Sequence, residues 1–244
     1  MALIVLPLIG LLQRAPWSSM WSQLTTDAVL TALRLSLECS ALAVAVSLLL
    51  GMPLAYMLAR TRFTGRSLVR ALVTLPMVLP PVVGGVALLF AFGAHGFAGQ
   101  ALSHVGISLP FTTAGAVLAE TFVAMPFLVI AVEAGLRQAD ERYEEVAATL
   151  GAGAWTRFWR VTVPLIAPSL AAGAALTWAR ALGEFGATIT FAGNLPGTTQ
   201  TMPLAVYVAL ESDTDGALAL SLILLAVSLA ILIGLRDRWL GTTT

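Results

Sequence analysis

The side chains that could do chemistry in this sequence are few, and they lie in two separate places. Arg180 and Glu184 interrupt a long apolar stretch, whereas Glu144 and Glu145 belong to a polar segment, residues 137–164, that separates two apolar stretches. A charge inside an apolar stretch usually pairs with an opposite charge or faces a water-filled cavity. Since Arg180 and Glu184 are four residues apart, they can neutralise each other on one helix face.

Residues needed for several kinds of catalysis are missing from the sequence. His95, His104 and Cys39 are too few for a metal cluster or a disulfide framework, so we expect neither a metal site nor a cofactor. Neither G-x-S-x-G nor H-E-x-x-H occurs. All thirteen basic residues are arginine, so the phosphate-binding pattern G-x-x-x-x-G-K-[ST] cannot occur. We therefore expect no enzymatic activity, and any nucleotide-driven work must come from a partner chain.

The elements that position these residues are predicted to be membrane helices. The chain has 244 residues, 58% of them hydrophobic and only 11% charged, whereas soluble domains carry about 25% charged residues. About 20 apolar residues in a helix cross the hydrocarbon core. We therefore predict an all-α integral membrane protein, one domain over residues 1–244. Its six transmembrane helices are expected at about 1–13, 28–59, 68–92, 113–133, 165–191 and 216–235.

The arginine distribution predicts the orientation of these spans. Ten of the thirteen arginines lie in the segments that directly follow the second, fourth and sixth spans. The positive-inside rule places arginine-rich segments in the cytoplasm. Both termini and residues 137–164 are therefore expected to be cytoplasmic. Residues 1–13 are short for a span, but they lack the charged start and cleavage site of a signal peptide, so we expect an abbreviated first helix.

The cytoplasmic segment has the pattern of a short helix, a turn and a second short helix. Tyr143, Val146, Ala147 and Leu150 follow the spacing i, i+3, i+4, i+7 and form one apolar stripe. Gly151 is placed to end the first helix, and an aromatic-rich second helix follows. The residues alone leave two interpretations open: a segment lying on the lipid headgroups, or a helix that docks into the groove of a partner.

This segment resembles the cytoplasmic signature E-A-A-x(3)-G-x(9)-I-x-L-P of bacterial ABC importer permeases. The sequence has Glu145-Val146-Ala147, then Gly151 after three residues, and "VTVP" at 161–164 after nine more. The resemblance implies the type I importer permease fold in the bacterial cytoplasmic membrane, with a coupling helix that inserts into a separate ATPase subunit. The residues to which it assigns ATPase coupling are Glu144, Glu145, Ala147, Ala148, Gly151, Ala152, Trp155 and Pro164.

Two further stretches resemble the molybdate permease family in particular. They are "GEFGATITF" at 183–191 and "LPMVLPPVVGG" at 75–85. The resemblance implies a homodimeric permease for molybdate and tungstate, driven by two ATPase subunits. It also implies an extracytoplasmic binding protein that delivers the oxyanion, a lipid surrounding, and no nucleic-acid partner.

The same stretches supply candidates for the translocation pathway. Proline removes backbone hydrogen bonds, and the freed groups must be satisfied by neighbouring helices or a wet cavity. The prolines of the third span predict such a break, although a kinked packing helix has the same sequence pattern. The candidate pathway residues are Pro76, Pro80, Pro81, Gly84, Arg180, Gly183, Glu184, Phe185, Gly186 and Thr188.

Several alternatives stay open. Arg180 and Glu184 form either a structural ion pair or a contact for the passing anion, and Glu120, in the fourth span, raises the same choice without an evident partner. A sulfate or thiosulfate permease is the near alternative in function. A proton-coupled secondary transporter that uses Glu120 and Glu184 is a different class; such transporters usually contain internal repeats, and no convincing repeat occurs here.

Overall fold

The computed structural model describes residues 2–240, and within them every regular element is helical. Three helices are long and apolar enough to cross a membrane, and the number rises to five if each of two bent helix pairs is one span. The long helices are α3 (Asp27–Arg60), α7 (Thr113–Gln138) and α14 (Thr214–Leu240). Residues 2–13 form α1 (Ala2–Gln13), which at 12 residues is short for a span. The six-span count stays a prediction.

The centre of the fold is a bundle of α3, α7 and α11 (Ala167–Leu182). The three helices meet at buried alanines, Ala43, Ala124 and Ala181. Gly173 also permits close packing, because a Cβ there would lie 2.9 Å from the Cβ of Ala131. The Trp178 indole N–H donates a 2.7 Å hydrogen bond to the buried Ser40 hydroxyl and ties α11 to α3.

The third predicted span is broken, as its prolines predict. It consists of α4 (Arg66–Val78) and α5 (Pro81–Phe92), which are bent by 119° relative to each other. Leu79 and Pro80 have extended backbone between them. Pro81 then occupies the first turn of α5, where a missing N–H costs nothing. The break therefore turns the second half of the span away from the bundle.

The fifth predicted span is not the single helix expected over residues 165–191. Its helix α11 ends at Leu182, and a separate short helix, α12 (Gly186–Phe191), begins after a three-residue interruption. Phe185 leaves helical geometry with φ −124° and ψ −55°. The break has no proline, and the interaction that stabilises it is a side-chain cap described below. A further helix, α13 (Met202–Ser212), lies in the connection that follows and packs on α14 and α3.

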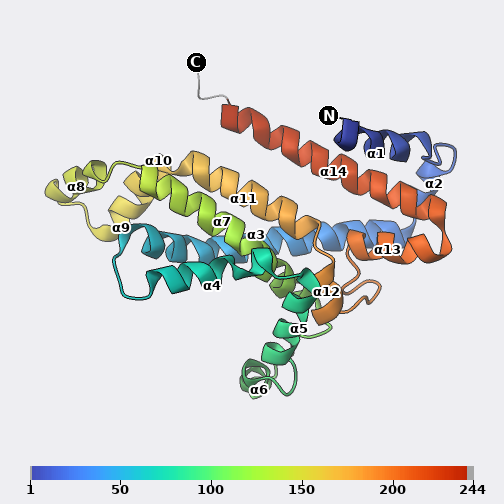
Figure 1. Cartoon of the computed structure of the whole chain (residues 1–244), viewed down its shortest axis with the longest axis horizontal. Helices are drawn as coiled ribbons and strands as arrows, with labels where there is room; N and C mark the ends of the chain where they lie inside the picture. The colour runs from blue at the N-terminus through green and yellow to red at the C-terminus, as the bar shows by residue number, and fades with distance from the viewer. Residues whose placement is uncertain (1, 241–244) are drawn as a thin grey trace.

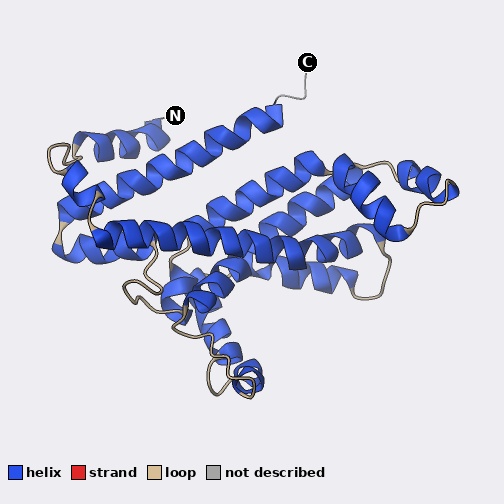
Figure 2. Ribbon diagram, turned by 180° about the vertical axis from the view of Figure 1, so that it is seen from behind, coloured by secondary structure: helices blue, strands red, loops and turns tan. Residues whose placement is uncertain are grey.

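Figure 1 shows how these elements are arranged. The bundle is elongated, and α8 (Arg142–Thr149), α9 (Ala154–Arg157), η1 (Phe158–Thr162) and α10 (Val163–Leu165) lie at one end, with α2 (Met20–Leu24) and α13 at the other. The pair α5 and α6 (Phe97–Ser103) projects from its side, and both views show α1 and α14 lying together along another side (Figure 2). The helix α14 runs toward the end that carries α8. Met1 and residues 241–244, the extreme termini, lie outside the described residues.

The predicted orientation is tested by cysteine accessibility. In a Cys39→Ala background, Ser212→Cys and Thr198→Cys are expected to react with an impermeant thiol reagent added to intact cells, because both positions are exposed in connections predicted to lie outside. Thr156→Cys, exposed between α8 and α10, is expected to react only after the cells are opened. Labelling of Thr156→Cys in intact cells would show that the orientation is reversed.

Candidate functional site

The helix–turn–helix predicted for residues 137–164 is present, and it forms a protruding segment between α7 and α11 (Figure 1). We call residues 137–164 the coupling segment, after the role that the resemblance implies. Its first helix, α8, ends at a turn whose geometry requires glycine. Gly151 has φ +83°, a conformation that residues with a Cβ rarely adopt. A Cβ there would meet nothing within 4 Å, so backbone conformation rather than space explains the glycine.

Two hydrogen bonds complete the turn. The Gly151 N–H donates to the Ala148 carbonyl and the Ala152 N–H donates to the Ala147 carbonyl, each at 3.0 Å. This is the Schellman arrangement, in which the last carbonyls of a helix are satisfied by the residues that follow it. Ala147, Ala148 and Ala152 thus act through their backbone here, and the turn holds α8 and α9 at a defined angle.

The coupling segment exposes apolar side chains. Leu150 at the tip is 83% exposed and Trp155 is 74% exposed, and Tyr143 and Val146 are also exposed. Trp155 and Trp159 pack edge to face with ring centroids 5.6 Å apart. Exposed apolar surface of this kind marks a protein or membrane contact. Pro164 lies in the short helix α10, which begins the return to the bundle.

The structure separates the two adjacent acids of this segment. Glu145 is exposed, whereas Glu144 turns inward and pairs with Arg60 at the end of α3, 3.4 Å away. The sequence pattern does not distinguish the two acids, and it indicates no specific role for Arg60. No local signal points to this pair, because the two residues are 84 positions apart.

The second group of predicted residues lies where the two broken spans meet. Here α5 packs against α12, and two glycines allow the approach. A Cβ on Gly85 would lie 2.7 Å from the Cβ of Thr190, and one on Gly186 would lie 2.8 Å from the Cβ of Pro81. These distances are too short for ordinary contacts, so glycine at both positions is what brings the two interruptions together.

Glu184 stabilises the interruption between α11 and α12. Its side chain is 1% exposed, and its Oε2 forms an ion pair with Arg180, 2.6 Å from Arg180 Nη2. The other oxygen, Oε1, accepts a 2.8 Å hydrogen bond from the Ala187 N–H in the first turn of α12, the place where a helix leaves N–H groups without partners. The ion pair that the spacing predicts is present, and the same carboxylate also caps α12.

A pocket of about 300 Å³ opens beside this ion pair. Six of the ten candidate pathway residues contribute to its lining: Pro81, Arg180, Gly183, Glu184, Phe185 and Gly186. The Arg180 side chain is 29% exposed. Both members of the Arg180–Glu184 ion pair line this pocket, so their opposite charges largely neutralise each other at its wall.

The other four candidates lie away from this pocket lining. Pro76 is buried inside α4 and Pro80 precedes α5. Gly84 faces Phe122 of α7, whose Cε1 would lie 3.1 Å from an added Cβ. Thr188 is fully buried in α12. These residues shape the helices around the pocket rather than its surface.

Glu120 is buried in α7, with 1% exposure. Within the described part of the chain, its Oε2 has no hydrogen-bond partner. Among the described residues, none forms an ion pair with Glu120.

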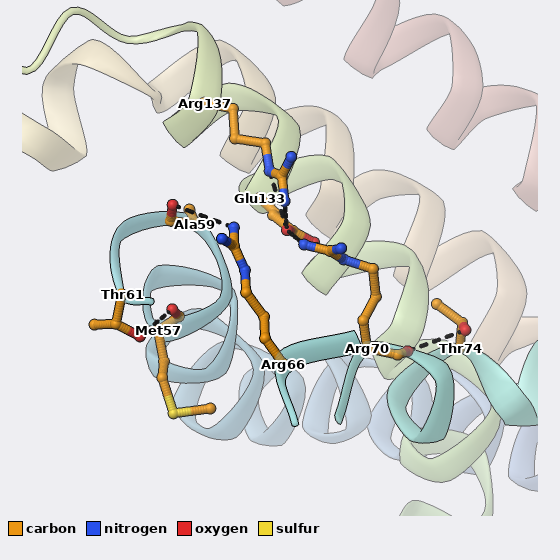
Figure 3. Close-up of polar contacts among 8 residues, drawn as sticks. All are labelled: Met57, Ala59, Thr61, Arg66, Arg70, Thr74, Glu133 and Arg137. Carbon is orange, nitrogen blue, oxygen red and sulfur yellow. Dashed lines mark hydrogen bonds and ion pairs between the residues drawn. The ribbon is translucent and has the colours of Figure 1, made fainter. Parts of the chain in front are cut away.

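A third polar cluster was missed by the sequence analysis (Figure 3). Glu133 of α7 is almost buried, and its Oε1 accepts from Arg70 Nη2 at 2.5 Å and from Arg137 Nη2 at 2.7 Å. Arg137 is four residues away on the same helix, so that half of the cluster has a local signal. Arg70 comes from α4 and ties the first half of the broken span to the bundle.

The described residues thus form a helical chain with a protruding helix–turn–helix and two interrupted spans that pack against each other. The family model "Binding-protein-dependent transport system inner membrane component" matches residues 47–241. The chain belongs to this family, which confirms a transport subunit rather than an enzyme.

Individual relatives and a solved structure agree. The chain is 46% identical over 242 residues to the molybdenum transport system permease protein ModB of Mycobacterium tuberculosis, covering 99% of this chain and 92% of the relative. It is 37% identical over 238 residues to the sulfate transport system permease protein CysT of Escherichia coli, covering 96% and 86%. A bacterial alginate ABC transporter, solved with its alginate-bound periplasmic protein, has a TM-score of 0.77 at 19% identity and covers 98% of this chain and 89% of its own. The importer permease fold is thereby confirmed.

The role of Arg180 and Glu184 is tested with single and double substitutions. If the pair is structural, Arg180→Gln leaves a buried carboxylate without its cation, at a cost of roughly 3–5 kcal/mol. We expect both Arg180→Gln and Glu184→Gln to lower membrane abundance and uptake, and the double variant to be milder than either. The measurements are uptake and quantitative immunoblotting of membranes. A double variant of normal abundance without uptake would instead place Arg180 on the substrate pathway.

Proposed function

We propose that this chain is the membrane-spanning permease subunit of an ATP-driven importer for molybdate and tungstate. Two copies form the translocation pathway, two separate ATPase subunits drive it through the coupling segment, and an extracytoplasmic binding protein delivers the oxyanion. The observation that carries the substrate assignment is 46% identity over 99% of the chain to a molybdenum permease, against 37% over 96% to a sulfate permease.

The geometry of the coupling segment supports ATPase docking over a headgroup-bound loop. Leu150, Val146 and Trp155 are exposed on a segment that stands beyond the end of the bundle (Figure 1). A short helix with an apolar face and a rigid turn suits a groove on a protein partner. Glu145 remains exposed beside this face, where it is available to a basic group of the ATPase.

The proposed pathway is the region where α5 meets α12. Both helices belong to interrupted spans, and interruptions at membrane depth are tolerated where they are buried in protein or line a cavity. The pocket beside Arg180 satisfies this condition. Tetrahedral dianions of similar size differ little in charge, so we assign selectivity to the binding protein. The binding-protein partner is supported by the alginate transporter, which was solved with such a protein bound.

The substrate assignment is tested by uptake in proteoliposomes. The permease, its ATPase and the binding protein encoded with them are reconstituted, and uptake of labelled molybdate and labelled sulfate is compared. We expect ATP-dependent molybdate uptake that excess tungstate abolishes and excess sulfate leaves largely unchanged. Uptake of sulfate in preference to molybdate would identify the sulfate class instead.

The docking role is tested at the turn of the coupling segment. We expect Gly151→Leu to reduce uptake by at least about tenfold, because a side chain with a Cβ resists the left-handed conformation at a cost of roughly 1–2 kcal/mol, and the apolar face is then misdirected. The permease should still reach the membrane, since the turn is exposed and a Cβ there meets no other atom within 4 Å. Gly153→Ala is the matched control, because Gly153 has an ordinary φ of −66°. Normal ATPase binding and uptake with Gly151→Leu would contradict the docking role.

A further inference from the structure

The coupling segment has a third attachment besides its two covalent ends on α7 and α11. Arg60, in the last turn of α3, reaches across to it. Its Nη1 donates to Glu141 Oε1 at 2.5 Å, and its Nη2 donates to Glu144 Oε1 and to the Ala139 carbonyl, both at 3.4 Å. One guanidinium therefore contacts the residues that join α7 to α8 and the first turn of α8.

Arg60 differs in its surroundings from its neighbour Arg62, although both count equally in the positive-inside pattern. The Arg60 side chain is only 10% exposed, whereas Arg62 is exposed. A nearly buried guanidinium is costly unless it is paired and hydrogen-bonded. Glu144 is itself only 18% exposed, so its contact with Arg60 is partly shielded from water, whereas Glu141 is 68% exposed.

The helix α8 packs mainly on α9 and η1. A pocket of about 280 Å³ lies between the end of α3 and α8, and Arg60 spans it. One turn earlier on α3, Tyr56 packs edge to face on Phe158 of η1, with ring centroids 5.8 Å apart. Tyr56 and Arg60 thus hold the two halves of the coupling segment, the first by an aromatic contact and the second by charge.

We propose that Arg60 is a positioning residue for energy coupling: it fixes the angle of α8 relative to α3, so that a displacement imposed by the ATPase on the coupling segment moves α3 as well as α7 and α11. The inference rests on the proposed function. The helix α3 is suited to this role, because it runs from the coupling segment to the opposite end of the bundle and packs on α7, α11 and α13 (Figure 1). In this proposal Glu144 is the ion-pair partner of Arg60, and Glu145 is the acidic residue that remains free to contact the ATPase.

The test is the ratio of molybdate transported to ATP hydrolysed, measured on the reconstituted complex of permease, ATPase and binding protein. A folding defect lowers the amount of complex but leaves this ratio unchanged, whereas a positioning role predicts that the ratio itself falls. We expect Arg60→Ala to lower the ratio by up to about tenfold. The reason is that losing one charged hydrogen bond lowers the population of the productive α8 position by about that factor. Arg60→Lys, which cannot span both carboxylates, is expected to fall between Arg60→Ala and the unmodified chain. The matched control, Arg62→Ala, removes an exposed arginine and should leave the ratio unchanged.

Two further variants test the same contact from the other side. If Arg60→Ala is not recovered in membranes, the chain carrying both Glu141→Gln and Glu144→Gln keeps Arg60 and should show the same fall in the ratio. The charge exchange Arg60→Glu with Glu141→Arg should restore part of it. An unchanged ratio in Arg60→Ala would overturn this inference. If Arg60→Ala is not recovered, an unchanged ratio in the double Gln variant would overturn it. Neither result would affect the proposed docking. Normal uptake and ATPase binding with Gly151→Leu would reject the proposed docking itself.

Discussion

The structure depends on one constraint: backbone groups at membrane depth must find partners within the protein. Two predicted spans are interrupted, at Pro80–Pro81 and between α11 and α12. Neither interruption is tolerable alone in lipid, and the fold places them against each other. Gly85 and Gly186 make this possible, because a Cβ on either would come within 2.8 Å of a neighbouring atom. Glu184 then caps the N–H of Ala187 that the second break frees.

Three groups of buried charges follow a related rule; Glu120, which has no ion pair among the described residues, is not one of them. Taking a charge out of water is tolerated when an opposite charge and hydrogen bonds accompany it. Glu184 has Arg180, Glu133 has Arg70 and Arg137, and Arg60 has Glu141 and Glu144. The ion pairs add to the apolar packing that holds α4 and α12 to the rest of the fold, and they link α8 to the end of α3.

In the proposed function, this arrangement connects the coupling segment with the pathway region. The coupling segment is continuous with α7 and α11, and α11 ends at the capped break beside the proposed pathway. The helix α11 thus joins the coupling segment to Glu184, after a bend of 75° between residues 154–165 and α11. In the proposed coupling role of Arg60, its contact with α8 adds α3 to this connection. The fold is consistent with helices that move as rigid elements and change their angles at the breaks.

The sequence by itself determined the features that depend on near neighbours. The apolar composition required a membrane, Gly151 ended α8 because only glycine adopts its conformation easily, Pro80 and Pro81 broke the third span, and Arg180 met Glu184 one turn away. Tertiary structure alone decided the pairing of Arg60 with Glu141 and of Arg70 with Glu133, which are 81 and 63 residues apart. It also decided the break before α12 and the contact of Gly85 with Thr190. The reason is physical: helix periodicity relates residues within one turn, whereas contacts between helices depend on how the whole bundle packs.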